Sequence, residues 1–347
     1  MAARAPFSIG EFEIEAGAQR TIDLPVSVLS DHTPVTMSVH VVHGEKPGPT
    51  LFISAAIHGD EVIGVEIVRR VLQSKSLSKL RGTLLAIPIV NAFGFMNHSR
   101  YLPDRRDLNR SFPGSPKGSL AGRLAHLFET EILDRSDVGI DLHSAAIHRT
   151  NLPQIRVSPS GARTSELANA FGAPLVLMSK VRDGSLRGVA QKKGVDVLLY
   201  EAGEGLRFDE FSVRVGVSGI LRVMHTLGMI GAKGVPKSRT TSMQSSHSVW
   251  ERSPAGGLLR CFVGTGENVS KGQVLGIVSS PFGDFEENVI ATHGGLIIGR
   301  TNLPIVNEGD GLFHIATIRQ NISAETKIEN IAAELEDSIM ADEDEII

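Results

Sequence analysis

The stretch Thr50-Leu-Phe-Ile-Ser-Ala-Ala-Ile57, followed at once by His58-Gly-Asp-Glu61, decides the fold of this chain. The first part is a short apolar run that follows turn material, which predicts a buried strand. From Glu61 to Leu72 the apolar residues recur at helical spacing, which predicts a helix. A buried strand that runs into an amphipathic helix is the repeating unit of α/β proteins, so this class is the first expectation.

The same alternation of strands and helices continues along the chain. Further strands are expected at 35–42, 83–90, 138–142, 175–178 and 195–200, and further helices at 119–133, 165–171 and 211–227. Such alternation implies right-handed crossovers and parallel pairing. We therefore expect an α/β fold whose mixed, largely parallel sheet carries helices on both faces. Ligands of such sheets bind beyond the carboxyl ends of the strands.

Beyond residue 232 the composition changes. Residues 233–248 are small and polar, which predicts a linker, and the glycine-separated runs after them predict a small all-β barrel or sandwich domain. The last 14 residues carry seven acidic side chains and no basic one, which is typical of a solvated or disordered end. The expected organisation is an N-terminal β segment packed on the α/β domain (1–45), the α/β domain (46–232), the linker (233–248), the β-barrel domain (249–320) and an acidic tail (321–347).

The composition excludes several classes of protein. The 347 residues hold 35 Lys and Arg against 39 Asp and Glu, with two Tyr and one Trp, so nothing indicates a nucleic-acid surface. A single cysteine excludes an internal disulfide and a metal site built of thiolates. No apolar run approaches the ~18 residues of a membrane span, and the first residues lack the apolar core of a secretory signal. We therefore expect a cytoplasmic protein without nucleic-acid or membrane partners.

His58 and Glu61 are the first candidates for chemistry. They lie three residues apart where the predicted strand passes into the helix, so one turn can place both side chains on the same side. An imidazole and a carboxylate placed in this way suit Zn²⁺. The structural alternative is a helix start whose acidic first turn is stabilised by the helix dipole.

Two further polar residues follow buried strands. His143 comes directly after the strand at 138–142, and Glu201 directly after the strand at 195–200. Because the carboxyl ends of parallel strands meet at one edge, His143 is expected to join His58 and Glu61 in a two-histidine, one-glutamate metal set. Glu201 is a candidate general base beside a metal-activated water, and the alternative is a capping or salt-bridging glutamate.

The loop from Arg100 to Gly114 carries four arginines and no lysine. An arginine fork grips a carboxylate with two hydrogen bonds, which a lysine cannot do, so the loop suits an anionic ligand. The alternative is a basic loop that faces water. His148, five residues after His143, is a further candidate for the pocket lining, and Arg149 and Arg156 have a similar standing.

Four motifs in order resemble the succinylglutamate desuccinylase/aspartoacylase family, which is itself similar to the zinc carboxypeptidases. They are His58-Gly-Asp-Glu61, Asp107-Leu-Asn-Arg-Ser-Phe-Pro-Gly114, Asp141-Leu-His-Ser144 and Tyr200-Glu-Ala-Gly203. The resemblance covers roughly residues 45 to 230, and the segment 250–316 resembles the small β-barrel that ends many bacterial members. It implies a carboxypeptidase-like fold and makes the α/β domain the catalytic one.

The resemblance also implies a role for each matching residue. His58, Glu61 and His143 match the ligands of one zinc ion per chain, and Glu201 matches the catalytic glutamate. Asn109 and Arg110 match the pair that holds the substrate's carboxylate. For the arginine that polarises the scissile carbonyl, Arg100 and Arg106 both remain candidates, because the loop is longer here than the family's matching stretch.

The expected activity is a zinc-dependent amidohydrolase, or deacylase, that cleaves the amide bond of a small N-acyl amino acid or related N-acyl amine. The alternative is a zinc carboxypeptidase acting on peptide C-termini with the same residues. A carrier protein of the biotinyl kind is a weaker alternative, because the expected hairpin tip, Asp284-Phe-Glu-Glu-Asn288, has no lysine. The oligomeric state stays open, with a homo-oligomer among the alternatives.

Overall fold

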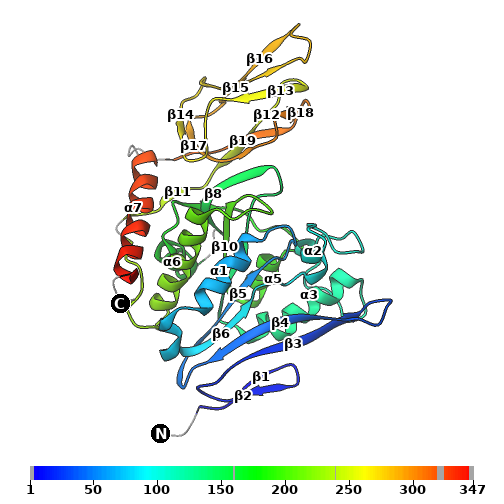
Figure 1. The fold of residues 1–347 in the computed structure, drawn as a ribbon, viewed down its shortest axis with the longest axis vertical. Helices are drawn as coiled ribbons and strands as arrows, with labels where there is room; N and C mark the ends of the chain where they lie inside the picture. The colour runs from blue at the N-terminus through cyan, green and yellow to red at the C-terminus, as the bar shows by residue number, and fades with distance from the viewer. Residues whose placement is uncertain (1–3, 159–160, 239, 319–323, 344–347) are drawn as a thin grey trace.

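The computed structural model describes residues 4–158, 161–238, 240–318 and 324–343. Its main feature is a large mixed sheet that runs through most of the molecule (Figure 1). In spatial order its strands are β12 (Ser248–Arg252), β19 (Gly311–Ala316), β17 (Gly295–Thr301), β8 (Arg149–Val157), β10 (Asp196–Gly203), β7 (Val138–His143), β5 (Lys46–Ala55), β6 (Arg81–Ile87), β4 (Pro34–His43) and β3 (Gln19–Val28). Three short strands join it from the side: β9 (Leu175–Met178), β11 (Met243–Ser245) and β14 (Asn268–Val269).

The centre of this sheet is parallel. Strands β6, β5, β7 and β10 pair in parallel, whereas β8 pairs antiparallel with β10 and β4 pairs antiparallel with β6. Every residue of β7 is buried, as expected of a parallel strand that is covered on both faces. The mixed α/β fold expected from the sequence is confirmed.

Helices cover both faces of the sheet. One face packs against α1 (Ile63–Leu72), α4 (Ala162–Phe171) and α6 (Glu210–Thr226), and the other against α3 (Leu120–Glu131) and α5 (Leu186–Lys193). Figure 1 shows α1 and α6 side by side, with α3 and α5 on the other side of the sheet. Shorter helical turns lie at α2 (Ala92–Met96), η1 (Lys75–Lys79), η2 (Leu108–Arg110) and η3 (Leu133–Arg135). No helix among the described residues has the length and apolar character needed to cross a membrane.

The C-terminal β region is continuous with the main sheet. Strands β12, β19 and β17 join it because β17 pairs antiparallel with β8. A second sheet of this region holds β16 (Glu286–Ile290), β15 (Val274–Ser279), β13 (Gly257–Cys261) and β18 (Ile305–Val306), and the two sheets enclose a core of their own. At the other end of the molecule β1 (Phe7–Ile9) and β2 (Phe12–Ile14) form a separate hairpin (Figure 1).

Several elements differ from what the sequence analysis expected. Strand β8 and helix α5 were not anticipated, and the segment expected as a linker contributes β11, which pairs with β9. The expected hairpin tip at 284–288 lies largely within β16, because the turn between β15 and β16 falls at 280–285, which also has no lysine. The C-terminal helix α7 (Ala324–Glu343) is anchored on the main domain, since Ile331 and Leu335 are buried in the same hydrophobic cluster as the apolar residues of α6.

Candidate active site

The loop between β5 and α1 carries His58 and Glu61. The Glu61 N–H donates to the His58 carbonyl over 3.1 Å, so the chain turns sharply before α1 begins at Ile63, two residues later than expected. Gly59 permits this turn, because a Cβ there would lie 1.9 Å from the carbonyl carbon of Gly94. The loop therefore packs on α2 and directs both side chains inward.

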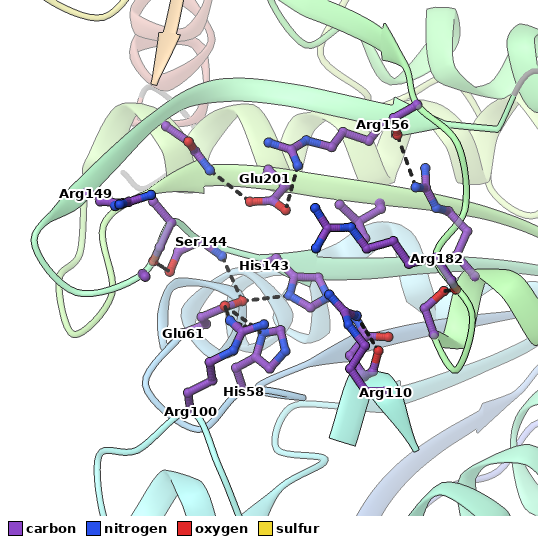
Figure 2. A pocket seen from close by; sticks show the side chains of 18 of the residues that line it. His58, Glu61, Arg100, Arg110, His143, Ser144, Arg149, Arg156, Arg182 and Glu201 are labelled. Atoms are coloured by element: carbon purple, nitrogen blue, oxygen red, sulfur yellow. Dashed lines mark hydrogen bonds and ion pairs between the residues drawn. The ribbon is translucent and has the colours of Figure 1, made fainter. Parts of the chain in front are cut away.

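His58, Glu61 and His143 converge as expected. His58 Nδ1 lies 2.7 Å from Glu61 Oε1, and His143 Nδ1 lies 2.7 Å from Glu61 Oε2. The three side chains offer ligand atoms within 4.8 Å of one another, and each is at most 4% exposed (Figure 2). This cluster, called the His-Glu-His cluster below, lies at the carboxyl ends of β5 and β7, where α/β sheets bind their ligands.

The outer nitrogens of both imidazoles face carboxylates. His58 Nε2 lies 3.2 Å from Asp107 Oδ1, and His143 Nε2 lies 2.8 Å from Asp141 Oδ2. Such a partner fixes the proton on Nε2 and leaves the Nδ1 lone pair free, as is usual for histidines that bind metals. Two imidazoles, one carboxylate and their supporting aspartates are a donor set that fits Zn²⁺.

The charges of the cluster are strongly coupled. Burial lowers the pKa of the His58 imidazole, but the charge of Glu61 and the hydrogen bonds with Asp107 and Glu61 outweigh burial and raise that pKa. The pKa of His143 is raised for a similar reason, through Asp141 and Glu61. Burial also raises the pKa of Glu61, but the two imidazoles outweigh it and hold that pKa well below its ordinary range. The Glu61 carboxylate is thus held in its ionised form between the two imidazoles.

The structure separates the two candidate arginines. Arg100 Nη1 lies 3.3 Å from Glu61 Oε1, and its guanidinium donates to Asp107 Oδ2 over 3.0 Å, so it reaches the cluster. Arg106 points away: its side chain is 63% exposed and lies 3.9 Å from Asp104. The expectation that Arg106 competes for the carbonyl position is therefore corrected, because its exposed side chain does not line the pocket that holds the cluster.

Asn109 and Arg110 line the same pocket from η2. The Asn109 side-chain oxygen accepts the Leu186 N–H over 3.0 Å, which ties this turn to the start of α5. His148 does not line the pocket, contrary to the expectation. It is an exposed turn residue with φ of 65°, and its backbone N–H donates to Glu204.

Glu201 lies across the pocket from the His-Glu-His cluster (Figure 2). It is opposite His143 in the parallel pairing of β10 with β7, which is why the two side chains open into one cavity. Its carboxylate accepts a hydrogen bond from Asn151 Nδ2 over 2.9 Å and lies 3.5 Å from Arg156 Nη1.

The pocket has a volume of about 390 Å³ and a surplus of arginines. Six line it: Arg100, Arg110, Arg149, Arg156, Arg182 and Arg187. Burial, together with the charge of Arg156, lowers the pKa of Arg187 to about 10, and its Nη1 has no partner among the described residues. Arg182 and Arg187 were missed from the sequence, because they lie in α5 and the loop before it, where no motif marked them.

The C-terminal β region reaches the pocket through Trp250 of β12. The guanidinium of Arg149 lies over the Trp250 ring, 5.1 Å from its centroid, and the His314 ring stacks on Trp250 at 4.6 Å. Trp250 is the sequence's single tryptophan, and nothing in the local sequence connected it with a site some hundred residues earlier.

Comparison with known proteins gives consistent results. A model of the succinylglutamate desuccinylase/aspartoacylase catalytic domain matches residues 47–227, just over half of the chain. The N-alpha-acetyl-L-2,4-diaminobutyric acid deacetylase of Halomonas elongata is 26% identical over 324 residues, covering 90% of this chain and 95% of its own. A succinylglutamate desuccinylase/aspartoacylase crystal structure from Rhodobacter sphaeroides superposes with a TM-score of 0.78 at 23% identity, over 86% of this chain and 96% of its own. The product-bound ectoine utilization protein EutE of Ruegeria pomeroyi gives a TM-score of 0.78 at 24% identity, over 86% and 95%.

The fold and the site, with these relatives, define a hydrolase that acts on amide bonds. More particularly, the chain belongs to the succinylglutamate desuccinylase/aspartoacylase family, whose members are deacylases. The resemblance drawn from the four motifs is thereby confirmed.

Proposed function

We propose that this protein is a zinc-dependent deacylase that hydrolyses the amide bond of a small N-acyl amino acid or related N-acyl amine. The observation that carries the proposal is the His-Glu-His cluster, whose two Nδ1 atoms and carboxylate converge opposite Glu201 in one pocket. His58, Glu61 and His143 would hold one zinc ion. Zinc supplies a Lewis acid that polarises a carbonyl oxygen and acidifies a water molecule.

The chain's own residues would complete the reaction. Glu201 takes a proton from the attacking water at its carboxylate and returns it to the leaving nitrogen, so that the amide C–N bond breaks. The guanidinium of Arg100, beside the cluster, stabilises the negative charge that develops on the carbonyl oxygen. Asn109 and Arg110 anchor a substrate carboxylate from the other side of the pocket.

The charge of the pocket bears on the substrate. Arg149, Arg156, Arg182 and Arg187 add four cationic groups to the lining, against the single carboxylate of Glu201 on that side. A free ammonium group on the substrate would be repelled there, whereas a second carboxylate would be attracted. We therefore expect an acidic acyl or amino-acid part, in contrast to the diamino acid named for the Halomonas relative.

A carboxypeptidase would use the same residues on a peptide C-terminus. The size of the pocket and the wall formed by Arg149 and Trp250 favour a compact substrate over a peptide chain. The deacylase is therefore the preferred activity.

The test is a screen of zinc-loaded protein against matched substrates. N-acetyl and N-succinyl derivatives of acidic, neutral and diamino acids are assayed beside peptides with free C-termini, with released amine as the readout. We expect the highest kcat/KM for an acyl-amino acid with at least two carboxylates. Faster cleavage of peptides than of any acyl-amino acid would overturn the proposal in favour of the carboxypeptidase.

A further inference from the structure

The pairing of β8 with β10 is irregular next to Glu201. Glu201 of β10 is opposite Gln154 of β8, and Gly203 of β10 is opposite Asn151 of β8. Two steps along β10 therefore correspond to three steps along β8. Between these two pairs β8 has one residue more than β10, which makes a β-bulge. The bulge contains Pro153, and proline is found at bulges because it has no N–H to donate to the neighbouring strand.

The bulge decides which side chains of β8 meet Glu201. In a regular strand, residues an odd number apart point to opposite faces, so Asn151 and Arg156 would not face the same pocket. Because of the extra residue both do, and they reach different oxygens of one carboxylate. Asn151 Nδ2 donates to Oε2 over 2.9 Å, and Arg156 Nη1 lies 3.5 Å from Oε1, with Arg156 shown beside Glu201 in Figure 2.

The C-terminal β region makes room for this arrangement. Gly299 of β17 is opposite Asn151, and a Cβ on Gly299 would lie 2.7 Å from the Asn151 side-chain oxygen. A larger residue at 299 must therefore displace the amide of Asn151, a residue that is 8% exposed. The position of Asn151 thus depends on a strand that comes nearly 150 residues later in the sequence.

We propose that Asn151 is a positioning residue for Glu201, aimed by the bulge of β8 and given its place by Gly299. The proposal rests on the proposed function, in which Glu201 is the general base. An amide donor at Oε2 fixes the plane of the carboxylate without neutralising its charge, so the base meets the attacking water in one orientation. Through Gly299 and Asn151, the C-terminal β region would therefore influence the orientation of the Glu201 carboxylate without contacting the substrate there.

The first test compares neighbouring residues of β8. Asn151→Ala is expected to lower kcat by about 10- to 100-fold, with KM and zinc content close to those of the wild type, as is usual when a supporting hydrogen bond is lost. The matched control is Thr150→Ala. Thr150 is not part of the pocket lining and accepts a hydrogen bond from Asn302, so this variant is expected to keep its kcat. An Asn151→Ala enzyme with wild-type kcat would overturn the proposal.

The second test examines Gly299. Gly299→Ala alone is expected to lower kcat in the same direction as Asn151→Ala, because the added methyl displaces the amide. In the Asn151→Ala background the same change is expected to have little further effect, since the amide is already absent. Full additivity of the two losses would contradict the role given to Gly299.

A third measurement needs no substrate. In zinc-free protein, the losses in Tm caused by Asn151→Ala and Glu201→Ala are expected to add up to more than the loss in the double variant, because both single changes remove the same hydrogen bond. Additive losses would contradict the contact.

If Glu201→Gln keeps the wild-type rate, the base assignment of the proposed function fails and this proposal fails with it. If Glu201→Gln is inactive while Asn151→Ala is fully active, only the positioning role is overturned.

Discussion

Arg100 and Arg106 lie six positions apart in one loop, yet only Arg100 reaches the His-Glu-His cluster. Arg100→Ala is expected to lower kcat/KM by about 10²- to 10³-fold, because a donor to the developing oxyanion is lost, a contribution of about 3 to 4 kcal/mol. Arg106→Ala is the matched control and is expected to retain wild-type kcat/KM. Steady-state kinetics on the best substrate of the screen measure both values of kcat/KM. An equal loss in both variants would refute the assignment of Arg100 as the donor to the oxyanion.

Site residues could be predicted from the sequence where the residues around them form a recognisable strand or helix pattern. His58, Glu61 and His143 follow apolar strands, so their meeting at one sheet edge was foreseeable and is observed. Asn151 and Arg187 were not foreseeable in this way. Asn151 faces the pocket through a bulge, and Arg187 through the orientation of a short helix, and neither feature leaves a local pattern in the sequence.

The contact between α1 and α6 is reinforced by a surface ion network. Arg70 donates to Glu66 of its own helix over 2.7 Å and to both oxygens of Glu210 in α6 over 2.7 and 2.8 Å. Hydrogen bonds from Arg69 and Arg70 lower the pKa of Glu66 to about 2, and those from Arg70 and Arg214 lower the pKa of Glu210 to about 2.

The network predicts a pH-dependent contribution to stability. Because the folded pKa values lie below the ordinary value of 4.5, the stabilisation is complete above that pH and is lost as the pH falls towards about 2. Arg70→Ala is expected to lower the free energy of unfolding by about 1 kcal/mol at pH 7, since Glu210 is half exposed and screened by solvent. Urea unfolding at pH 7 and pH 3 measures this difference. A difference as large at pH 3 as at pH 7 would contradict the network's role.

The elements that the sequence analysis anticipated are those with a clear apolar pattern. The run at 50–57 corresponds to β5, and the helical spacing after Glu61 corresponds to α1. Strand β8 was not predicted, because its pocket-facing side chains are polar and Pro153 interrupts the pattern. Helix α5 was not predicted, because it has only eight residues and its buried residues are Leu186, Val189 and Ala190.

Over the whole molecule, one sheet connects parts that are far apart in the sequence. The pairing of β17 with β8 joins the C-terminal β region to the strand that supports Glu201. Such long-range pairing leaves no local signal, so the sequence indicated a separate barrel after a linker without indicating its place. The boundaries expected at 232 and 249 remain predictions.

Metal binding is expected to stabilise the whole fold. The His-Glu-His cluster exists only in the folded state, so an ion that binds there raises the stability of that state by about 2.7 kcal/mol at a free concentration 100 times Kd. Treatment with a chelator is therefore expected to lower Tm, and added zinc to restore it. His143→Ala is the control, whose Tm is expected not to respond to zinc. A wild-type Tm that is independent of chelator and zinc would contradict a metal site here.

The most direct measurement is the zinc content and the hydrolytic rate of Glu201→Gln beside the wild type. Glutamine has the same shape as glutamate and accepts the Asn151 hydrogen bond, but it cannot take a proton from water. We expect one zinc ion per chain in both proteins and a rate lower by about 10²- to 10⁴-fold in the variant, the usual contribution of a general base. A variant that binds zinc and keeps the full rate would show that Glu201 is not the base.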